Sequence, residues 1–471
     1  PSPDVYRLKK IQGGRRMSRE RTAGALRLVL AAVLFLCVML AGCSGDGKKN
    51  ARESGASGRS ESSSNEAADS AASGGSEPAG RPSGGRLSQA AGNPQAAPGQ
   101  LTAGEWRDVE RWDDWQKLLG SREGANNRQW WEYYRFDRLV VKAEAGGQPI
   151  ADADVIVKDA DGRVVWRTKT DMDGYAYAYA RMFERDDPGA YMPEADGSQD
   201  TRRPSGREQQ EEGFSRVRPG YDVEVRAGGE TKTFSHVPIP RDEPLVVAFG
   251  ERPEPSDAVD LMFVVDTTGS MQDEIDFLRE ELKDVITRAR QGGGQLDIEV
   301  SVNFYRDRYD DYVIKPYPFT ADIDEAVSRI AAERAEGGGD YPEAVEQALT
   351  NAVSGHEWRR SARTRLLFLV GDAPPRNEPQ IVEELHEATL EAAKLGIRIV
   401  PVASSGVDVN TEYLMRFLAA ATGGTYVFLT DHSGIGNDHM EAAVGEFEVR
   451  PLNDLLVEII RRFAGLPETN G

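Results

Sequence analysis

Residues 259–271 read VDLMFVVDTTGSM, and this stretch decides the fold class. Five apolar residues at 261–265 are followed directly by Asp266, and the hydroxyl side chains of Thr268 and Ser270 come at alternate positions after it. An uninterrupted apolar run of this length is typical of a strand buried on both faces of a parallel sheet. Open α/β sheets bind ligands beyond the carboxyl ends of their strands, so we expect these three side chains to face a site there.

From this strand to the end of the chain, strand patterns alternate with helix patterns. Short apolar runs predict further strands at 298–304, 366–370, 397–402 and 426–429. Apolar residues at helical spacing predict helices at 275–286, 323–332, 343–353, 381–394, 412–421 and 452–463. The alternation predicts an α/β fold with a doubly wound, mostly parallel sheet and helices on both faces.

The polar residues after the first strand indicate a particular chemistry. One carboxylate, from Asp266, and two hydroxyls, from Thr268 and Ser270, form a set of hard oxygen donors. Such donors are the ligands that Mg²⁺, Mn²⁺ or Ca²⁺ prefers. We expect Mg²⁺ or Mn²⁺ here, with Ca²⁺ as a further possibility.

The pattern Asp266-x-Thr268-x-Ser270 after a buried strand resembles the metal-ion-dependent adhesion site (MIDAS) of von Willebrand factor type A (vWA) domains. Two later loops match the order of that family: GGGDYPE at 337–343, which contains Asp340, and GDAPP at 371–375, which contains Asp372. The resemblance covers about residues 258–465. It implies that Thr268 and Ser270 coordinate the ion directly, with Asp266 and Asp372 close by, directly or through water. In this family a carboxylate of the protein partner usually takes the remaining coordination position.

This chain departs from the family pattern at two positions. Thr268 replaces the first Ser and keeps the hydroxyl, whereas Asp340 stands where many members have Thr. With Asp266, Asp340 and Asp372 around one divalent ion, ion binding is strengthened and the attraction for a partner's carboxylate is weakened. Asp340 has two alternative roles: it acts on the ion through water, or it caps the following helix. A further alternative for the whole site is a metal-free vWA scaffold in which the Asp residues only cap helices.

The N-terminal part carries a targeting pattern. Met17 is followed by three arginines and by the apolar run 28–40, which ends in Leu-Ala-Gly before Cys43. Basic residues, a short apolar run and small residues before a cleavage point predict a secretory signal peptide. The tetrapeptide LAGC at 40–43 resembles the bacterial lipobox, which implies cleavage before Cys43, acylation of this residue and a membrane anchor outside the cytoplasm. Residues 1–16 are interpreted as an extension upstream of Met17.

Four segments are expected between the anchor and the vWA domain. Residues 44–103, rich in Ser, Gly, Ala and Pro, predict a disordered tether. Residues 104–132 contain five Trp and predict a helix whose Trp side chains pack inward, an aromatic platform for a sugar or peptide being the alternative. Residues 133–250 are similar to carboxypeptidase-regulatory-like and Cna-B-like β-sandwich modules, with a disordered insertion at 184–219. A hinge at 251–257 leads to the vWA domain at 258–467.

Composition narrows the class of function. The formal net charge of −21 argues against nucleic acid as a partner, because phosphate binding needs a basic face. The two Cys lie in the signal peptide and lipobox, so no disulfide is expected in the mature protein. We predict a non-enzymatic cell-surface lipoprotein that binds an unknown protein ligand through a divalent ion. The alternative is an aspartyl-phosphate type of phosphoryl-transfer enzyme using Asp266, because Asp-Thr-Thr-Gly-Ser is similar to the Asp-Lys-Thr-Gly-Thr signature, although it lacks the Lys.

Overall fold

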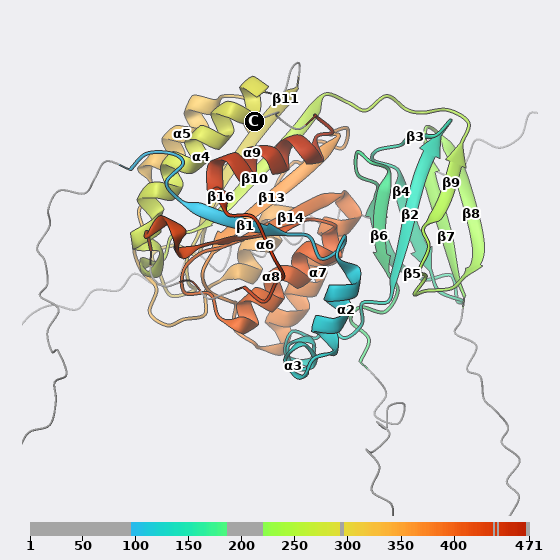
Figure 1. Cartoon of the computed structure of the whole chain (residues 1–471), viewed down its shortest axis with the longest axis horizontal. Helices are drawn as coiled ribbons and strands as arrows, with labels where there is room; N and C mark the ends of the chain where they lie inside the picture. The colour runs from blue at the N-terminus through green and yellow to red at the C-terminus, as the bar shows by residue number, and fades with distance from the viewer. Residues whose placement is uncertain (1–95, 186–219, 293–295, 437–438, 440–441, 468–471) are drawn as a thin grey trace, which may run out of the picture. The chain divides into compact units, whose positions relative to one another are not determined.

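The apolar run at 261–265 forms the core of β10 (Ala258–Asp266), a central strand of an eight-stranded sheet in the computed structural model. Every residue of β10 is buried, as expected for a strand covered on both faces. The strand order is β12-β11-β10-β13-β14-β15-β1-β16, and the five strands from β11 to β15 in this order are parallel (Figure 1). The predicted α/β fold with a mostly parallel sheet is therefore confirmed.

The four other strands predicted from the sequence, at 298–304, 366–370, 397–402 and 426–429, are all present in this sheet. Besides β10, the strands of the sheet are β1 (Thr102–Trp106), β11 (Asp297–Tyr305), β12 (Ile314–Lys315), β13 (Thr364–Gly371), β14 (Ile397–Ala403), β15 (Tyr426–Leu429) and β16 (Arg450–Pro451). The short strands β12 and β16 and the strand β1 have no counterpart in the sequence prediction.

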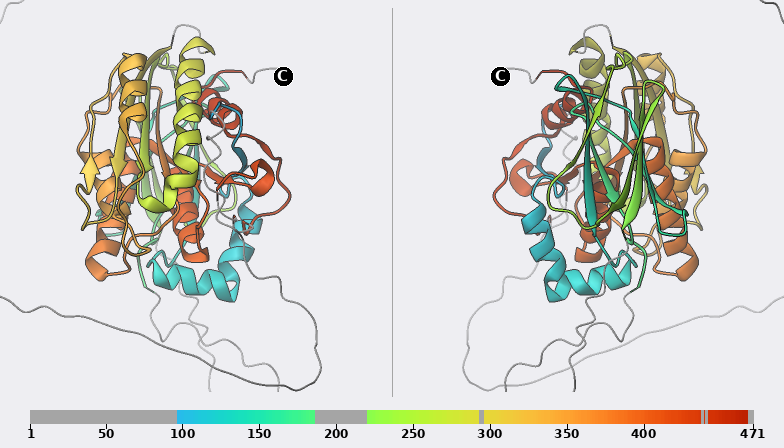
Figure 2. Two further views of the ribbon diagram at one scale, coloured as in Figure 1. Left: turned by 90° about the vertical axis from the view of Figure 1, so that its left-hand side faces the viewer. Right: turned by 90° about the vertical axis from the view of Figure 1, so that its right-hand side faces the viewer.

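Helices cover both faces of the sheet (Figures 1 and 2). Alternate residues of β10 point to opposite faces: Leu261 and Phe263 belong to one buried cluster, Met262 and Val264 to another. The first cluster includes residues of α4 (Gln272–Gly292), α5 (Ile323–Ala332) and α9 (Leu452–Phe463). The second includes residues of α6 (Val345–Ser354), α7 (Pro379–Leu395) and α8 (Val409–Thr422).

The structure describes residues 96–185, 220–292, 296–436, 439 and 442–467. These residues lie in one compact unit, Ser88–Gly471. The expected signal peptide, Cys43, nearly all of the expected tether and most of the expected insertion at 184–219 fall outside the described residues. Within the described ranges, no helix has the length and apolar character needed to cross a membrane.

The segment 104–132, expected to be Trp-rich and helical, begins with the last residues of strand β1. β1 pairs antiparallel with β15 on one side and with β16 on the other. Just before β1, the Glu281 carboxylate on α4 accepts hydrogen bonds from the backbone N–H groups of Gly99, Gln100 and Leu101 at 2.8–3.0 Å. The sequence Thr-Ala-Gly-Glu-Trp lacks an apolar run, so only pairing with distant strands makes it a strand.

Between β1 and the small sheets lie two short helices, α2 (Trp112–Gly120) and α3 (Arg122–Trp130). Trp115 and Trp131 are buried, and the Trp115 ring makes edge contacts with Phe136 and with Phe417 of α8. Inward packing of the Trp side chains is therefore confirmed for these two residues, whereas Trp130 is 49% exposed. The aromatic cluster serves as core rather than as an open platform.

Two four-stranded sheets occupy the segment between α3 and β10. One has the order β3-β2-β6 with β9 paired to β2, and the other has the order β5-β4-β7-β8. Their bounds are β2 (Arg138–Ala145), β3 (Gln148–Pro149), β4 (Asp154–Lys158), β5 (Val164–Lys169), β6 (Tyr175–Tyr179), β7 (Tyr221–Ala227), β8 (Glu230–Val237) and β9 (Leu245–Phe249). Buried residues of both small sheets belong to the same hydrophobic cluster as residues of α6, α7 and α8. The segment 251–257, which was expected to be a hinge, therefore connects the small sheets to the large sheet and its helices, and these share one hydrophobic cluster.

Candidate metal-ion site

β10 brings Asp266 to the carboxyl edge of the large sheet, and the turn that follows folds back onto this carboxylate. Asp266 Oδ1 accepts hydrogen bonds from Thr268 N at 2.8 Å and from Thr268 Oγ1 at 2.7 Å. The hydroxyl oxygens of Thr268 and Ser270 are 3.1 Å apart. Asp266 and Thr268 are fully buried. A hydroxyl that donates its proton to a carboxylate still presents its oxygen lone pairs to a cation.

Asp372 reaches the same edge from the neighbouring strand. β13 runs parallel to β10 with Val370 opposite Val265, so the residue just after β13 lies beside the turn that follows β10. The Asp372 residue is buried, and its charge raises the pKa of the Asp266 carboxyl group, as expected for two carboxylates at one edge of the sheet. The structure therefore brings together four of the five predicted metal ligands: Asp266, Thr268, Ser270 and Asp372.

Asp340, the fifth predicted ligand, is not part of this cluster. Its side chain is 58% exposed, and its Oδ2 accepts a hydrogen bond from Arg376 Nη2 at 2.7 Å. Arg376 also binds the buried carboxylate of Asp307 at 3.0 and 3.1 Å. The guanidinium group attracts Asp340, whereas the cluster of buried carboxylates repels it. The structure therefore places Asp340 apart from the other four predicted ligands. The alternative that Asp340 caps the following helix is wrong, because the residue before α6 is Ala344.

Glu343 supplies a third buried carboxylate instead. The residue is 3% exposed. A Cβ atom added to Gly338 would lie 3.2 Å from Thr268 Cβ and 3.4 Å from Glu343 Oε1, so both side chains border the same narrow gap. The backbone N–H of Glu343 donates to the carbonyl of Pro374 at 2.9 Å, which fixes this loop against the loop that carries Asp372. The sequence places Glu343 at the end of the glycine-rich loop. The resemblance to vWA domains points to Asp340 in the same loop, so Glu343 was not predicted.

The electrostatics of the cluster favour a bound cation. Burial raises the pKa of Asp266, and repulsion from Asp372 raises it further. Burial is also the largest cause of the raised pKa of Asp372. Burial and repulsion from Asp266 raise the pKa of Glu343 to about 9. Three buried oxygen atoms, Asp266 Oδ2, Glu343 Oε2 and Asp372 Oδ1, have no hydrogen-bond partner. Such oxygens cost free energy unless a proton or a cation compensates them.

The donor set fits a hard divalent cation, because all its members are carboxylate or hydroxyl oxygens. Across the described part of the chain, no three or more His, Cys, Asp or Glu side chains are arranged so that they alone could hold a metal ion. The hydroxyls of Thr268 and Ser270 would therefore have to complete the coordination.

Tyr305 at the end of β11 forms a wall of the site that was not predicted from the sequence. The side chain is buried, and burial together with the charge of Asp266 raises the pKa of its hydroxyl well above the ordinary value. A side chain at Gly371 would collide with this hydroxyl, so the glycine directly before Asp372 makes room for Tyr305. The hydroxyl stays protonated at neutral pH and adds no further negative charge to the site.

Comparisons with known proteins place the site within a recognised domain. A family model described as von Willebrand factor A domain matches residues 260–431. The putative ariadne-like RING finger protein R811 of Acanthamoeba polyphaga mimivirus is 30% identical over 125 residues, which are 26% of this chain and 11% of that protein. The alpha-protein kinase vwkA of Dictyostelium discoideum is 31% identical over 124 residues, which are 25% of this chain and 19% of that protein.

These matches span only a small part of the two curated relatives, at most 19% of their length. Among solved structures, the conserved hypothetical protein BatB from Bacteroides thetaiotaomicron is 14% identical with a TM-score of 0.32. That match covers 44% of this chain and 99% of BatB. The family match contains most of β10, all of β13 and the whole carboxylate cluster. Residues 260–431 of this chain are therefore similar to von Willebrand factor A domains.

Proposed function

We propose that the vWA domain binds a divalent cation, Mg²⁺ or Mn²⁺ with Ca²⁺ as a further candidate, and uses it to hold a protein partner without catalysis. The supporting observation is the convergence of buried, unpartnered carboxylate oxygens with two hydroxyls at the carboxyl edge of the sheet. A cation there would compensate charges that burial otherwise makes unfavourable. The role in protein binding follows from the resemblance to adhesion-type vWA domains.

In this proposal Asp266, Thr268, Ser270 and Asp372 hold the ion, and Glu343 adds a carboxylate from the chain itself. Three carboxylates outnumber the two positive charges of the ion, so a further carboxylate from a partner would be attracted only weakly. The partner is then held largely by the surface around the ion.

Two exposed aromatic side chains border the site and suit such a contact. Tyr309 is 83% exposed, and its ring lies 5.9 Å from the guanidinium carbon of Arg376. Tyr341 is 43% exposed, and its hydroxyl lies 3.4 Å from the carbonyl oxygen of Asp372. Tyrosine is enriched in protein–protein interfaces because it combines a large apolar surface with a hydrogen-bonding group.

We further propose that the protein is a lipoprotein on the outer side of a bacterial cell membrane, acylated at Cys43 and raised from the lipid by the tether. The two small sheets then act as a carboxypeptidase-regulatory-like or Cna-B-like β-sandwich that supports the vWA domain. The LAGC sequence at 40–43 supports the anchor. Replacing Cys43 by Ser should move the protein out of the membrane fraction, and unchanged retention in that fraction would count against acylation.

Ion-dependent capture tests the binding function. Wild-type protein and an Asp266→Asn variant are immobilised and exposed to solubilised cell-surface proteins in Mg²⁺ or in EDTA, with an Asp340→Asn variant as a control. We expect a partner that wild type and Asp340→Asn retain in Mg²⁺, that EDTA releases and that Asp266→Asn does not retain. An identical set of retained proteins under all conditions would contradict ion-dependent binding.

A further inference from the structure

A cavity lies at the edge of the large sheet opposite the candidate ion site, near the amino ends of β13 and β14. Its walls are β4, β5 and β7 of one small sheet and the 358–365 segment and the end of α7 from the vWA domain. The volume is about 440 Å³, a size typical of pockets for small ligands. Because it lies between two parts of the molecule, it is of the kind where small-molecule sites commonly occur.

Direct contacts hold the two walls of this cavity together. Arg365 Nη1 forms an ion pair with Asp152 Oδ1 at 3.0 Å. The buried Arg398 donates from Nη2 to the carbonyl of Lys169 at 2.6 Å. Away from the cavity, the Tyr179 hydroxyl donates to the carbonyl of Ala420 at 2.9 Å. With both walls fixed by these bonds, the cavity is preformed.

The cavity is lined by an excess of basic side chains. Each of the two walls contributes three of them: Arg167, Lys169 and Arg226 from the small sheet, and Arg360, Arg365 and Lys394 from the vWA domain. Only two acidic side chains, Asp154 and Glu391, line it. Such a concentration of positive charge is unusual in a chain with a net charge of −21.

Four of the six basic groups are neutralised by carboxylates. Lys169 Nζ lies 3.2 Å from Asp152 and 3.0 Å from Asp154. Asp152 also pairs with Arg365, as described above. Lys394 pairs with Glu391 at 2.7 Å. Arg226 pairs with Glu224.

Arg167 and Arg360 are left without such a partner. Both residues are exposed, and neither forms an ion pair with any carboxylate of the described residues. They come from opposite walls, Arg167 from β5 and Arg360 from the vWA domain, and both line the cavity. Two uncompensated guanidinium groups at one cavity are suited to an oxyanion, because each can donate two parallel hydrogen bonds to it.

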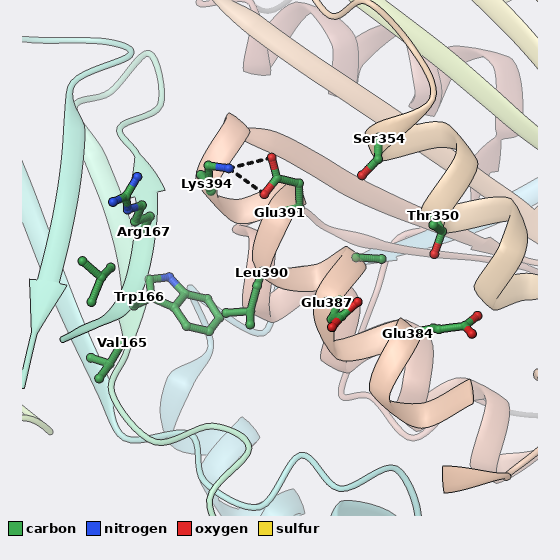
Figure 3. Close-up of a pocket in the computed structure, with 12 residues that line it drawn as sticks. Val165, Trp166, Arg167, Thr350, Ser354, Glu384, Glu387, Leu390, Glu391 and Lys394 are labelled. Atoms are coloured by element: carbon green, nitrogen blue, oxygen red, sulfur yellow. Dashed lines mark hydrogen bonds and ion pairs between the residues drawn. The ribbon is translucent and has the colours of Figure 1, made fainter. Parts of the chain in front are cut away.

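The surroundings of Arg167 limit where an anion can lie. A neighbouring groove of about 500 Å³ shares Arg167, Glu391 and Lys394 with the cavity, and the Glu391–Lys394 pair stands on α7 across from Arg167 (Figure 3). Farther along this groove are the carboxylates of Glu384 and Glu387, which repel an anion. The favourable position is therefore on the cavity side, between Arg167 and Arg360.

We propose that this cavity binds a small organic oxyanion, with a phosphate or carboxylate group held by Arg167 and Arg360. Apolar side chains of Ile156, Trp358 and Leu395 also line the cavity and would contact the body of the ligand. The site is separate from the proposed ion site and does not depend on it. Its ligand is bound where the small sheets meet the vWA domain, so binding also strengthens the contact between them.

Calorimetric titration with two probes tests this proposal. Phenyl phosphate and benzoate, which share an aromatic body and differ in the anionic group, are titrated into the purified protein at constant ionic strength. We expect saturable binding of at least one probe, which an Arg167→Gln/Arg360→Gln variant weakens by about tenfold or more. Binding of phenyl phosphate alone would identify a phosphate site, and binding of both would identify a general oxyanion site.

Two control variants test whether binding is specific to this cavity. Arg163→Gln removes an arginine whose side chain is 75% exposed, in the turn between β4 and β5, and should leave the affinity unchanged. Asp266→Asn should also leave it unchanged, whatever the fate of the ion site. Absence of saturable binding for both probes would overturn the proposal, as would an affinity that the double variant leaves unchanged or that Arg163→Gln lowers equally.

Discussion

The three buried carboxyl groups at the edge of the sheet govern the chemistry of the candidate site. Burial raises the pKa of all three groups; in addition, the charge of Asp372 raises the pKa of Asp266, and the charges of Asp266 and Asp372 raise the pKa of Glu343. Without a cation, the folded protein holds protons at these positions more tightly than the unfolded chain does. Ion binding, protonation and stability are therefore linked through the same three side chains.

Replacing Glu343 by Gln should separate stability from ion binding. Gln keeps the shape of the side chain and removes its charge, so the metal-free variant should be more stable than wild type at pH 8 by on the order of 1–2 kcal/mol. Its affinity for Mn²⁺ should fall by about tenfold, because one carboxylate is lost from the site. Urea denaturation and calorimetric titration measure the two quantities. Asp340→Asn, which changes an exposed carboxylate beside Arg376, should alter neither by more than about 0.5 kcal/mol.

The same linkage predicts how the metal-free protein responds to pH. A carboxyl group whose folded-state pKa is raised binds more protons in the folded state, so its contribution to stability is lost as pH rises through that pKa. For Glu343 the window extends from its ordinary pKa of 4.5 to about 9. In EDTA, the free energy of unfolding should therefore decrease between pH 5 and pH 9, and saturating Mg²⁺ should reduce the decrease. A stability in EDTA that rises with pH over this range, or a slope that Glu343→Gln does not reduce, would contradict the assignment.

The contrast between Asp340 and Glu343 shows what sequence alone could predict about the site. Asp266, Thr268 and Ser270 are fixed by short-range geometry, because they follow a buried strand directly, and Asp372 follows the adjacent parallel strand. The loop at 337–343 has no such constraint. Its two acidic residues, Asp340 and Glu343, are only three positions apart. Arg376, which lies beyond the next strand, binds Asp340 outside the cluster, and this long-range contact is not visible in the loop sequence.

Among the secondary-structure elements, β1 has the largest effect on how the domain must be defined. The elements with long apolar runs or strong helical periodicity, such as β10 and α9, were predictable because local pattern and burial agree. β1 lacks this signal and becomes a strand through pairing with β15 and β16, which are more than 300 residues away in the chain. The vWA domain is therefore completed by a strand that precedes the two small sheets.

Removal of β1 should destabilise the vWA domain. A chain that starts at Arg107 exposes the edges of β15 and β16, removes Leu101 and Ala103 from the core, and leaves the buried Glu281 carboxylate without its three backbone donors. We expect a loss of several kcal/mol in the free energy of unfolding relative to a chain that starts at Ala96. Chemical denaturation of the two chains measures the difference. Equal stability would show that β1 contributes nothing to the fold.

In the molecule as a whole, the small sheets and the vWA domain share a hydrophobic cluster and are joined by buried polar contacts. The Tyr179 hydroxyl of β6 donates to the carbonyl of Ala420 in α8 at 2.9 Å, and Arg398 of β14 donates to the carbonyl of Lys169 in β5 at 2.6 Å. The order of these parts along the chain was predictable from the sequence, but they were expected to be separate units connected by a hinge. Contacts between residues more than 200 positions apart leave no local pattern, which is why the shared core and the basic cavity beside it were not predictable.

The central claim is that a divalent cation binds at Asp266, Thr268, Ser270 and Asp372, and calorimetric titration of Mn²⁺ tests it most directly. Wild type, Asp266→Asn and Asp340→Asn proteins containing β1 and both small sheets are compared at pH 7.5. We predict a single-site isotherm for wild type and Asp340→Asn and no saturable binding for Asp266→Asn. Absence of binding to the wild type, or equal binding to Asp266→Asn, would contradict the claim.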